Sequence, residues 1–197
     1  MIDSSRRIPG DWYDGTIPAN AFLDETAYVE TSYSFLLYRT QAPTGLRMGP
    51  GSSAYRGTMF DLGSEAAVSV GEYALLNGAW IICDGRVEIG AYALISWNVV
   101  LMDSYRVPQD PAERRQAVHR LASGGIRRLA APAPARPIRI GRNVWIGFDV
   151  CVLPGISIGE GSVIGARSVV AADVPPYTVV AGNPARFVRK LERGESA

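Results

Sequence analysis

The sequence predicts a mainly β protein built as a parallel β-helix, in which short strands wind around a triangular prism. Three observations predict it. Aliphatic side chains return every six residues, a small or aliphatic residue stands two positions before each, and Gly or Ala follows most of them. This spacing fits neither the 3.6-residue period of a helix nor the two-residue period of a long strand. It is typical of hexapeptide repeats, in which the chain turns a corner every six residues.

The repeat is clearest over residues 138–190, where it runs through six hexapeptides without a break. The earlier runs hold three hexapeptides each, which make one coil. Breaks fall after Phe35, Phe60, Ile82 and Leu101, so each insertion should leave the prism at the same corner. We expect about six coils, roughly 29 Å in length. The paired inward positions are Ala21 and Leu23, Ala27 and Val29, Tyr33 and Phe35, Leu46 and Met48, Ser52 and Ala54, Thr58 and Phe60, Val68 and Val70, Ala74 and Leu76, Trp80 and Ile82, Val87 and Ile89, Ala93 and Ile95, Val99 and Leu101, and then Ile138 and Ile140 through to Ser168 and Val170.

We expect three parts along the chain. Residues 1–20 should form an irregular lead-in, rich in Pro and Gly and held down by aromatic residues such as Trp12. Residues 21–180 should form the β-helix domain, with an insertion over residues 102–137. Residues 181–197 should form a C-terminal cap, in which a short helix covers the open end of the prism.

The insertion should contain one helix. Asp110 is suited to cap it, Pro111 to occupy its first position and Glu113 its third. Val118 belongs to a modest apolar stripe, and Gly124-Gly125 should end the helix. Because an excursion of this length is uncommon in a compact repeat, we expect the insertion to be functional.

Composition sets broad limits. The chain has 197 residues, 20% of them charged, and a formal net charge of +1, which gives no global reason to expect nucleic acid. Two cysteines are too few for a disulfide framework. Neither a signal-peptide pattern nor an apolar run of membrane-spanning length is evident, so a soluble, cytoplasmic protein without a membrane partner is the expectation.

Short motifs within the repeat carry a resemblance to a known family. They are Asn143-Val144-Trp145-Ile146-Gly147, Leu153-Pro154-Gly155, Val163-Ile164-Gly165-Ala166, Asp173-Val174-Pro175-Pro176 and Ala181-Gly182-Asn183-Pro184-Ala185-Arg186. This set resembles the C-terminal signature of the hexapeptide-repeat acyltransferases, in particular the maltose, galactoside and capsule-sugar O-acetyltransferases. The resemblance is dense over residues 138–190, good over 68–116 and weak before them.

The resemblance implies a left-handed β-helix, an exception to the usual right-handed crossover. It also implies a homotrimer with active sites in the clefts between prisms, and acetyl-CoA or another acyl-CoA as co-substrate, with no metal. Its cofactor positions carry an indole beside the cleft, small residues along the pantetheine arm and Arg near the phosphates. An alternative is that the aromatic members only pack between subunits. The positions are Trp145, Phe148, Ala166, Ala171, Arg186 and Arg189.

On the acceptor side, the resemblance assigns Asn77 and Asp84 to the hydroxyls of a sugar. An alternative is purely structural. Asn77-Gly78 would form a turn, and Asp84-Gly85 would form a corner of the prism. Both interpretations can hold together.

The departure from the family lies at the catalytic base. In the related motif a His takes the proton from the acceptor, whereas here Val107 holds that place, and valine cannot accept a proton. The candidate replacements are His119, which is the only histidine, and Asp103 and Tyr105 at the mouth of the cleft. An amine acceptor would need less help from a base than a hydroxyl.

These observations favour transfer of an acyl group from acyl-CoA to a hydroxyl or amine of a small, sugar-like acceptor. The alternative is a catalytically silent binding or assembly protein on the same scaffold. A zinc enzyme that needs three His ligands is excluded, because each chain has one histidine. Nine Arg against two acids between residues 106 and 142 could meet an anionic ligand, or could simply be a solvated surface.

Overall fold

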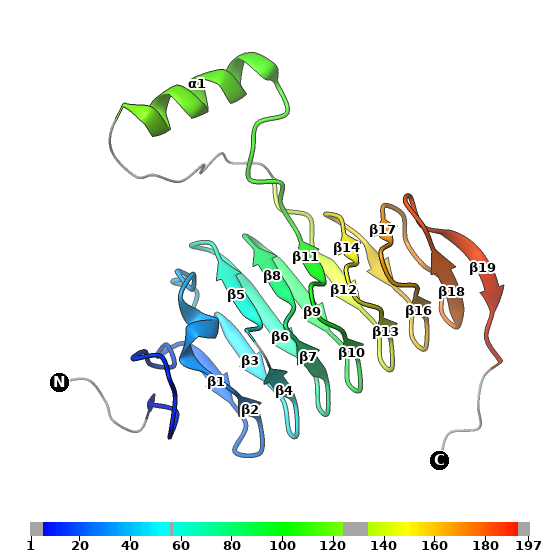
Figure 1. Ribbon diagram of the computed structural model, residues 1–197, viewed down its shortest axis with the longest axis horizontal. Coiled ribbons are helices and arrows are strands. Elements are labelled where there is room, and N and C mark those ends of the chain that lie inside the picture. Colours follow the sequence, from blue (N-terminus) through cyan, green and yellow to red (C-terminus); the bar gives the residue numbers. More distant parts are fainter. Residues whose placement is uncertain (1–5, 56, 124–133, 193–197) are drawn as a thin grey trace.

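The computed structural model describes residues 6–55, 57–123 and 134–192, and it shows a triangular prism from which one arm projects (Figure 1). Three sheets of parallel strands form the sides of the prism, and successive turns of the chain add one strand to each sheet. The first sheet contains β1 (Ala21–Leu23), β3 (Leu46–Met48), β6 (Ala67–Val70), β9 (Arg86–Ile89), β12 (Ile138–Ile140) and β15 (Ser157–Ile158); the second contains β2 (Tyr28–Val29), β4 (Ser53–Tyr55), β7 (Leu75–Asn77), β10 (Leu94–Ile95), β13 (Trp145–Ile146), β16 (Val163–Ile164), β18 (Thr178–Ala181) and β19 (Arg186–Lys190); the third contains β5 (Met59–Leu62), β8 (Trp80–Cys83), β11 (Val100–Met102), β14 (Cys151–Val152) and β17 (Val169–Val170).

The parallel β-helix is therefore confirmed, and its six coils match the six that the repeat predicts. In the first coil a 3₁₀ helix, η2 (Ser32–Phe35), takes the place of the strand on the third side. All four insertions leave between the third and first sides, as the breaks in the repeat predict. The longest runs from the end of β11 to the start of β12.

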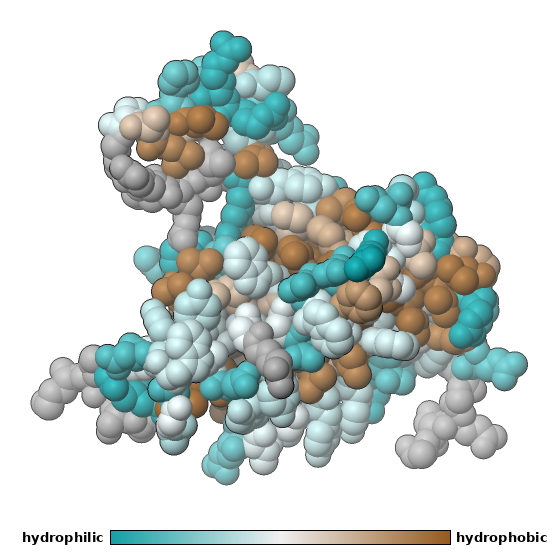
Figure 2. All heavy atoms as spheres, in the orientation of Figure 1, coloured by the Kyte–Doolittle hydropathy of each residue, from teal (hydrophilic) through white to brown (hydrophobic). Residues whose placement is uncertain are grey.

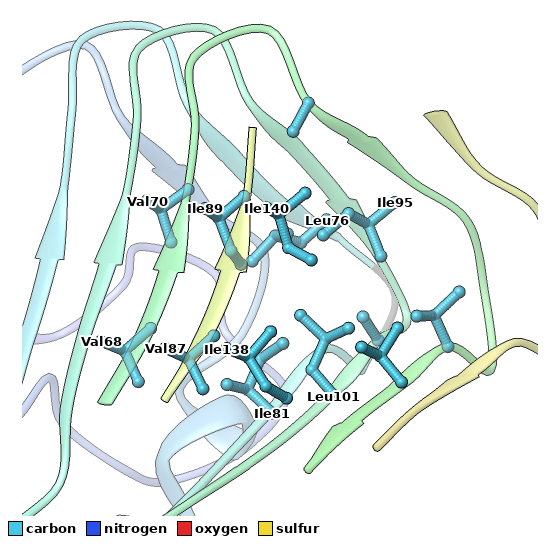
Figure 3. Close-up of a cluster of buried hydrophobic side chains, with 14 of the residues drawn as sticks. Val68, Val70, Leu76, Ile81, Val87, Ile89, Ile95, Leu101, Ile138 and Ile140 are labelled. Atoms are coloured by element: carbon cyan, nitrogen blue, oxygen red, sulfur yellow. The ribbon is translucent and has the colours of Figure 1, made fainter. Parts of the chain in front are cut away.

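The inward side chains form stacked columns. Figure 3 shows Val68, Val87 and Ile138 in one row and residues two positions later in the next row. The register agrees, since Val68 pairs with Val87 and Val87 pairs with Ile138 across adjacent strands. All three are buried. Burial of such columns in every coil supplies the main driving force for this fold.

The glycine after an inward aliphatic residue has a steric reason. A Cβ added to Gly90 would lie 2.6 Å from the carbonyl carbon of Gly141, and one added to Gly141 would lie 2.6 Å from the backbone nitrogen of Glu160. These corners stack so closely that backbone lies against backbone, and a larger residue would push successive coils apart.

The predicted register is wrong at two places. Tyr33 does not point inward, because it lies in η2 and its ring packs on Trp12 and Tyr13 of the lead-in. The second place is β8. Ile81 and Cys83 point inward on β8, whereas Trp80 is 44% exposed and Ile82 is partly exposed. The corner before β8 is one residue shorter than in the next coil, and Gly78 turns there with φ +69°. The six-residue spacing therefore shifts by one position in this strand.

The C-terminal helix expected within residues 181–197 is also wrong. Residues Arg186–Lys190 form β19, which pairs antiparallel with β18. The last strand of the second sheet has unpaired backbone groups along its edge, and β19 satisfies them. Phe187 and Val188 are exposed on this strand and do not cover the end of the prism. Residues 193–197 lie outside the described part of the chain.

The helix of the insertion is confirmed as α1 (Pro111–Ala122). The side chain of Asp110 accepts hydrogen bonds from the backbone nitrogens of Ala112 and Glu113, both at 2.9 Å. Figure 1 shows α1 on an arm held away from the prism. The predicted stop at Gly124-Gly125 lies outside the described residues. In the part of the chain that the structure describes, no helix has the length and apolar character needed to cross a membrane.

The lead-in packs on the first coil. Trp12 lies 5.4 Å from Tyr33 between ring centroids, although it stays 73% exposed. Asp11 accepts hydrogen bonds from the hydroxyls of Thr31 and Ser32 and from the backbone of Ser32. Desolvation opposes ionisation of Asp11, but these hydrogen bonds prevail and lower its pKa to about 2.

The stacked core can be tested by truncating one buried side chain. Replacing Ile146 with Ala should lower the free energy of unfolding by about 3 kcal/mol, because the change leaves a cavity between coils. Urea denaturation followed by circular dichroism would measure it. The control Val118→Ala, on an exposed position of α1, should change stability by less than about 0.5 kcal/mol. Equal effects of the two substitutions would contradict the assignment of the core.

Candidate active site

The three outer faces of the prism differ in chemistry. On the first sheet most outward residues are polar, with Phe22 on β1 as an exception, and Glu88 forms an ion pair with Arg139 at 3.1 Å. The second and third sheets carry apolar residues on the outside, and Figure 2 shows hydrophobic side chains on the prism below the arm. An exposed apolar surface of this kind is unusual on a monomeric protein. The outward apolar residues are Leu75, Leu94, Trp145 and Val163 on the second sheet and Trp80, Val100, Cys151 and Val169 on the third.

The first four cofactor candidates lie along the last two coils. Trp145 lies on β13 with its indole 53% exposed. Phe148 occupies the following corner, where its ring stacks on Trp97 at 5.8 Å. Ala166 lies at the same corner of the next coil, directly against Gly147. Ala171 follows β17 on the third side. Trp145, Phe148 and Ala166 therefore lie around the corner between the second and third sides, whereas Ala171 lies at the far end of the third side.

The basic candidates Arg186 and Arg189 lie on β19, in the same sheet as Trp145. In the sheet order β13, β16, β18, β19, three inter-strand steps separate the strand of Trp145 from the strand of the two Arg residues, a distance of about 14 Å. Both Arg residues are exposed. An aromatic side chain and two guanidinium groups thus share one outer face of the prism.

The acceptor candidates Asn77 and Asp84 lie near opposite ends of β8. Asn77 ends β7, whereas Asp84 lies in the tight turn between β8 and β9. The structure places them at different corners of the prism. A ligand in contact with both would have to extend along β8.

Asp84 is engaged by the arm. Arg106 Nε lies 3.0 and 2.9 Å from the two carboxylate oxygens of Asp84. Its Nη1 lies 2.8 Å from Asp61, and its Nη2 donates to the backbone oxygen of Asp61 at 2.9 Å. Arg39 also pairs with Asp61, at 2.9 Å. We call these four side chains the Arg106 clamp. It contains two positive and two negative charges, so it is neutral as a unit.

The clamp fixes where the arm leaves the prism. The Arg106 side chain is 19% exposed, and its backbone has φ +54°, a conformation that costs about 1 kcal/mol or more in a residue other than Gly. Burial opposes the charged form of Arg106, but the hydrogen bonds and charges of Asp84 and Asp61 together prevail and raise its pKa. The local strain is therefore held in place by charge-assisted hydrogen bonds.

Asp103, the first catalytic candidate, is buried and stabilises a turn of the prism. Its side chain is fully buried, and its carboxylate accepts hydrogen bonds from the backbone nitrogens of Asp84, Gly85 and Arg86 at 2.8–2.9 Å. It thereby holds the turn between β8 and β9. The Cys83 thiol donates to the same carboxylate at 3.3 Å. Burial, followed by the charge of Asp103, raises the pKa of Cys83 far above its usual value, which leaves the thiol protonated.

The other two catalytic candidates line different hollows. Tyr105 and Val107 line a hollow of about 500 Å³ between the arm and the prism, which we call the Val107 hollow. His119 lines a second hollow of about 480 Å³ along α1, together with Val118 and other residues of that helix. The structure thus groups Tyr105 with Val107 and places His119 in a separate hollow. In the described ranges, His, Cys, Asp and Glu side chains form no group of three that could hold a metal ion.

The Arg-rich stretch is divided by the structure. Arg106 belongs to the clamp, and Arg142 lies 4.5 Å above the ring of Tyr92 and 3.6 Å from Glu72. Arg114 donates to the backbone oxygens of Pro108 and Gln109, which ties α1 to the arm. The remaining basic residues are Arg115 and Arg120 on α1, Arg136 before β12, Arg139 on β12, and Arg127 and Arg128, which lie outside the described residues.

The Arg106 clamp and the residues that complete the Val107 hollow could not be predicted from the local sequence. Asp61 and Arg39 were not singled out, because nothing in their local sequence marks them. A signal was available only for Arg106, which lies directly between Tyr105 and Val107. An Arg at this position, in a segment that follows a buried strand, could have been matched to the acids of earlier coils.

The clamp makes a prediction about stability. The coupling energy between Arg106→Ala and Asp84→Asn in a double-mutant cycle should be about 1–3 kcal/mol, because the pair is partly buried and joined by several hydrogen bonds. Denaturant unfolding of the four proteins would measure it. Arg7 and Asp14, an exposed ion pair at 2.9 Å, provide the matched control and should couple by less than about 0.5 kcal/mol. Similar coupling in both cycles would refute the anchoring role.

Comparison with known proteins agrees with this architecture. A family model described as bacterial transferase hexapeptide, with six repeats, matches residues 137–172. The galactoside O-acetyltransferase of Escherichia coli is 39% identical over 132 residues, which are 67% of this chain and 57% of that enzyme. A Staphylococcus aureus protein named as an acetyltransferase is 59% identical over 58 residues, 29% of each chain. The chain therefore spans less than two thirds of the length of these curated relatives.

A solved structure extends the likeness over most of the chain. The hexapeptide-repeat acetyltransferase of Vibrio cholerae, complexed with acetyl coenzyme A, superposes with a TM-score of 0.60 at 26% identity, over 81% of this chain and 75% of that one. The prism is thus a left-handed parallel β-helix. The repeat, its geometry and these likenesses show that the chain carries the bacterial transferase hexapeptide repeat and has the fold of the hexapeptide-repeat acetyltransferases.

Proposed function

We propose that the protein transfers an acetyl or other acyl group from acyl-CoA to a hydroxyl or amine of a small, sugar-like acceptor. The single observation that carries the proposal is the shared outer face of β13 and β19. There an exposed indole and two guanidinium groups lie about 14 Å apart, over short outward side chains. An extended thiol cofactor with phosphates at one end fits this order of apolar and basic groups.

Trp145 would flank the pantetheine arm, Phe148 and the backbone near Ala166 and Ala171 would border it, and Arg186 and Arg189 would meet the phosphates. The V. cholerae relative is described as complexed with acetyl coenzyme A, which supports this assignment. Ala171 and the following Ala172 offer neither a hydroxyl nor a charge. The cofactor's phosphates would therefore depend on the Arg residues of β19.

The protein would act as a homotrimer with its sites between neighbouring prisms. The support is the uneven distribution of outward side chains. The first sheet is polar apart from Phe22 on its first strand, whereas the second and third sheets carry exposed Trp145, Leu94 and Trp80. Two apolar faces on a three-sided prism can each contact a neighbour if three prisms stand side by side. The cleft between two prisms would then contain the cofactor face.

In the reaction, the acceptor would attack the thioester carbon directly, and CoA would leave. Most of the rate enhancement would come from positioning two substrates in one cleft. Among the candidates Asp103, Tyr105 and His119, the geometry favours Tyr105. The reason is that Tyr105 lines the Val107 hollow and that its hydroxyl makes no hydrogen bond with another described residue. Its hydroxyl could donate a hydrogen bond to the thioester oxygen as negative charge develops there.

A second candidate function is binding without turnover. The observation that favours it is Val107, which cannot accept a proton at the position of the family's histidine. Asp84 and Asn77 could still contact a sugar in that case. Cofactor binding alone does not separate the two functions, whereas release of free CoA in the presence of an acceptor does.

Cofactor binding is the first test. The wild-type protein should bind acetyl-CoA in isothermal titration calorimetry, and Trp145→Ala should weaken binding about tenfold through the loss of aromatic contact area. Trp12→Ala is the matched control, since Trp12 is exposed on the lead-in, and it should leave the affinity unchanged. Absence of binding at near-millimolar acetyl-CoA would refute the proposed function.

Catalysis is the second test. Tyr105→Phe should reduce kcat for thioester cleavage about 100-fold while the Kd for acetyl-CoA stays constant, because the change removes only a hydrogen-bond donor. Release of CoA would be followed with a thiol reagent, and Tyr28→Phe is the control on an exposed Tyr of β2. If His119→Ala abolishes turnover and Tyr105→Phe does not, the displaced histidine is the catalytic group.

A further inference from the structure

The Arg106 clamp changes the role of Asp84. In the family resemblance this carboxylate is assigned to acceptor hydroxyls, yet here both of its oxygens face the guanidinium of Arg106. A sugar hydroxyl would have to compete with a charge-assisted, multidentate pair for the same lone pairs. The acceptor should therefore find its polar anchor at another place along the arm.

The Val107 hollow offers such a place. Its volume of about 500 Å³ lies within the range of small-molecule sites. It borders the residue that replaces the family's histidine, so it lies where that histidine would have met the acceptor. The residues that line it are Tyr105, Val107, Pro108, Gln109, Asp110, Glu113, Pro134, Arg136 and Pro154.

The charged groups of the hollow are not equivalent. The Asp110 carboxylate is occupied as the cap of α1, where it accepts from two backbone nitrogens. The Glu113 carboxylate, one turn further along α1, makes no hydrogen bond or ion pair with another described residue. The same is true of the guanidinium of Arg136, whose backbone is held by Asp103 and Gly155. Glu113 is thus the carboxylate that remains available to a cation in this hollow.

We propose that the Val107 hollow is the acceptor subsite, that it takes a primary amine bound as its ammonium form, and that Glu113 holds the ammonium and accepts its proton. The proposal rests on the acyl transfer proposed above. Val107 agrees with it, since an amine that has lost one proton is already a nucleophile. A hydroxyl, in contrast, must lose its proton to a base during the attack. Arg136 would orient the rest of the acceptor, while Tyr105 keeps its proposed hydrogen bond to the thioester oxygen.

The step balances in atoms and charge. The ammonium gives one proton to the Glu113 carboxylate, and the nitrogen lone pair attacks the thioester carbon. A C–N bond forms, the C–S bond breaks, and the sulfur leaves with its electron pair. The second nitrogen proton passes to the sulfur, which yields free CoA as a thiol. Glu113 returns its proton to water, and the net products are an amide, CoA and one proton.

The test uses the full-length protein, acetyl-CoA and matched acceptor pairs. The pairs are glucosamine with glucose, galactosamine with galactose, and ethanolamine with ethylene glycol. We expect the wild type to acetylate at least one amine at least 100-fold faster than its hydroxyl counterpart. Glu113→Gln should lower kcat/KM for that amine about 100-fold. It should also raise, about tenfold, the Kd with which the amine binds to the protein already saturated with free CoA. The affinity for acetyl-CoA should not change.

Two variants serve as controls. Glu113→Asp keeps the charge and the favourable position in the first turn of α1, so it should recover part of the lost amine binding. Glu25→Gln, on an exposed turn at the other end of the prism, should behave as the wild type.

The outcomes separate the two levels of the proposal. If acetyl-CoA does not bind, the proposed function fails and the amine subsite fails with it. If acetyl-CoA binds but sugars are acetylated on hydroxyls as fast as on amines, the amine subsite alone is refuted. The same holds if none of the three amines is acetylated, or if Glu113→Gln acetylates the amine at the wild-type rate.

Discussion

Direct contact between the backbones of successive coils determines the architecture of this protein. Each coil rests on the next through parallel hydrogen bonds and through corners where Gly90 and Gly141 have no room for a side chain. The strands can therefore tolerate almost no change in length. Additional chain can enter only where the ladder is interrupted, between the third and first sides. The position of the arm, and of any site on it, follows from this constraint.

The same contact explains which features could be predicted from the sequence. The inward pair Val144 and Ile146 repeats because each coil copies the geometry below it, so the period alone indicates the core and the coil number. The period could not reveal that the corner at Gly78 is one residue short. Pairing with the neighbouring strands, in which Trp80 faces both Met59 and Val100, decides the register there. Arg186–Lys190 could not be identified as a strand because its partner, the free edge of β18, is a tertiary feature.

One part of the candidate site could likewise be predicted from the repeat, and the other part could not. Its cofactor face is built from repeat positions, so a motif such as the one around Trp145 places it on the prism directly. The Arg106 clamp joins residues 22 and 45 positions apart in the chain, and no local pattern connects Arg106 with Asp84 or Asp61. Long-range ion pairs of this kind become visible only once the coils are stacked.

The clamp also ties acceptor chemistry to the architecture of the prism. Arg106 spans three coils, since Asp61 follows Phe60 in the second, Asp84 follows Cys83 in the third, and Arg106 itself extends the fourth. Breaking it would leave two acids with one fewer cation in a partly buried place, which is costly. A carboxylate that could serve a ligand is thereby committed to holding the arm. The arm, held in this way, places Tyr105 and Glu113 on one side of the prism. The side chains that remain available to bind an acceptor therefore belong to the insertion and not to the repeat.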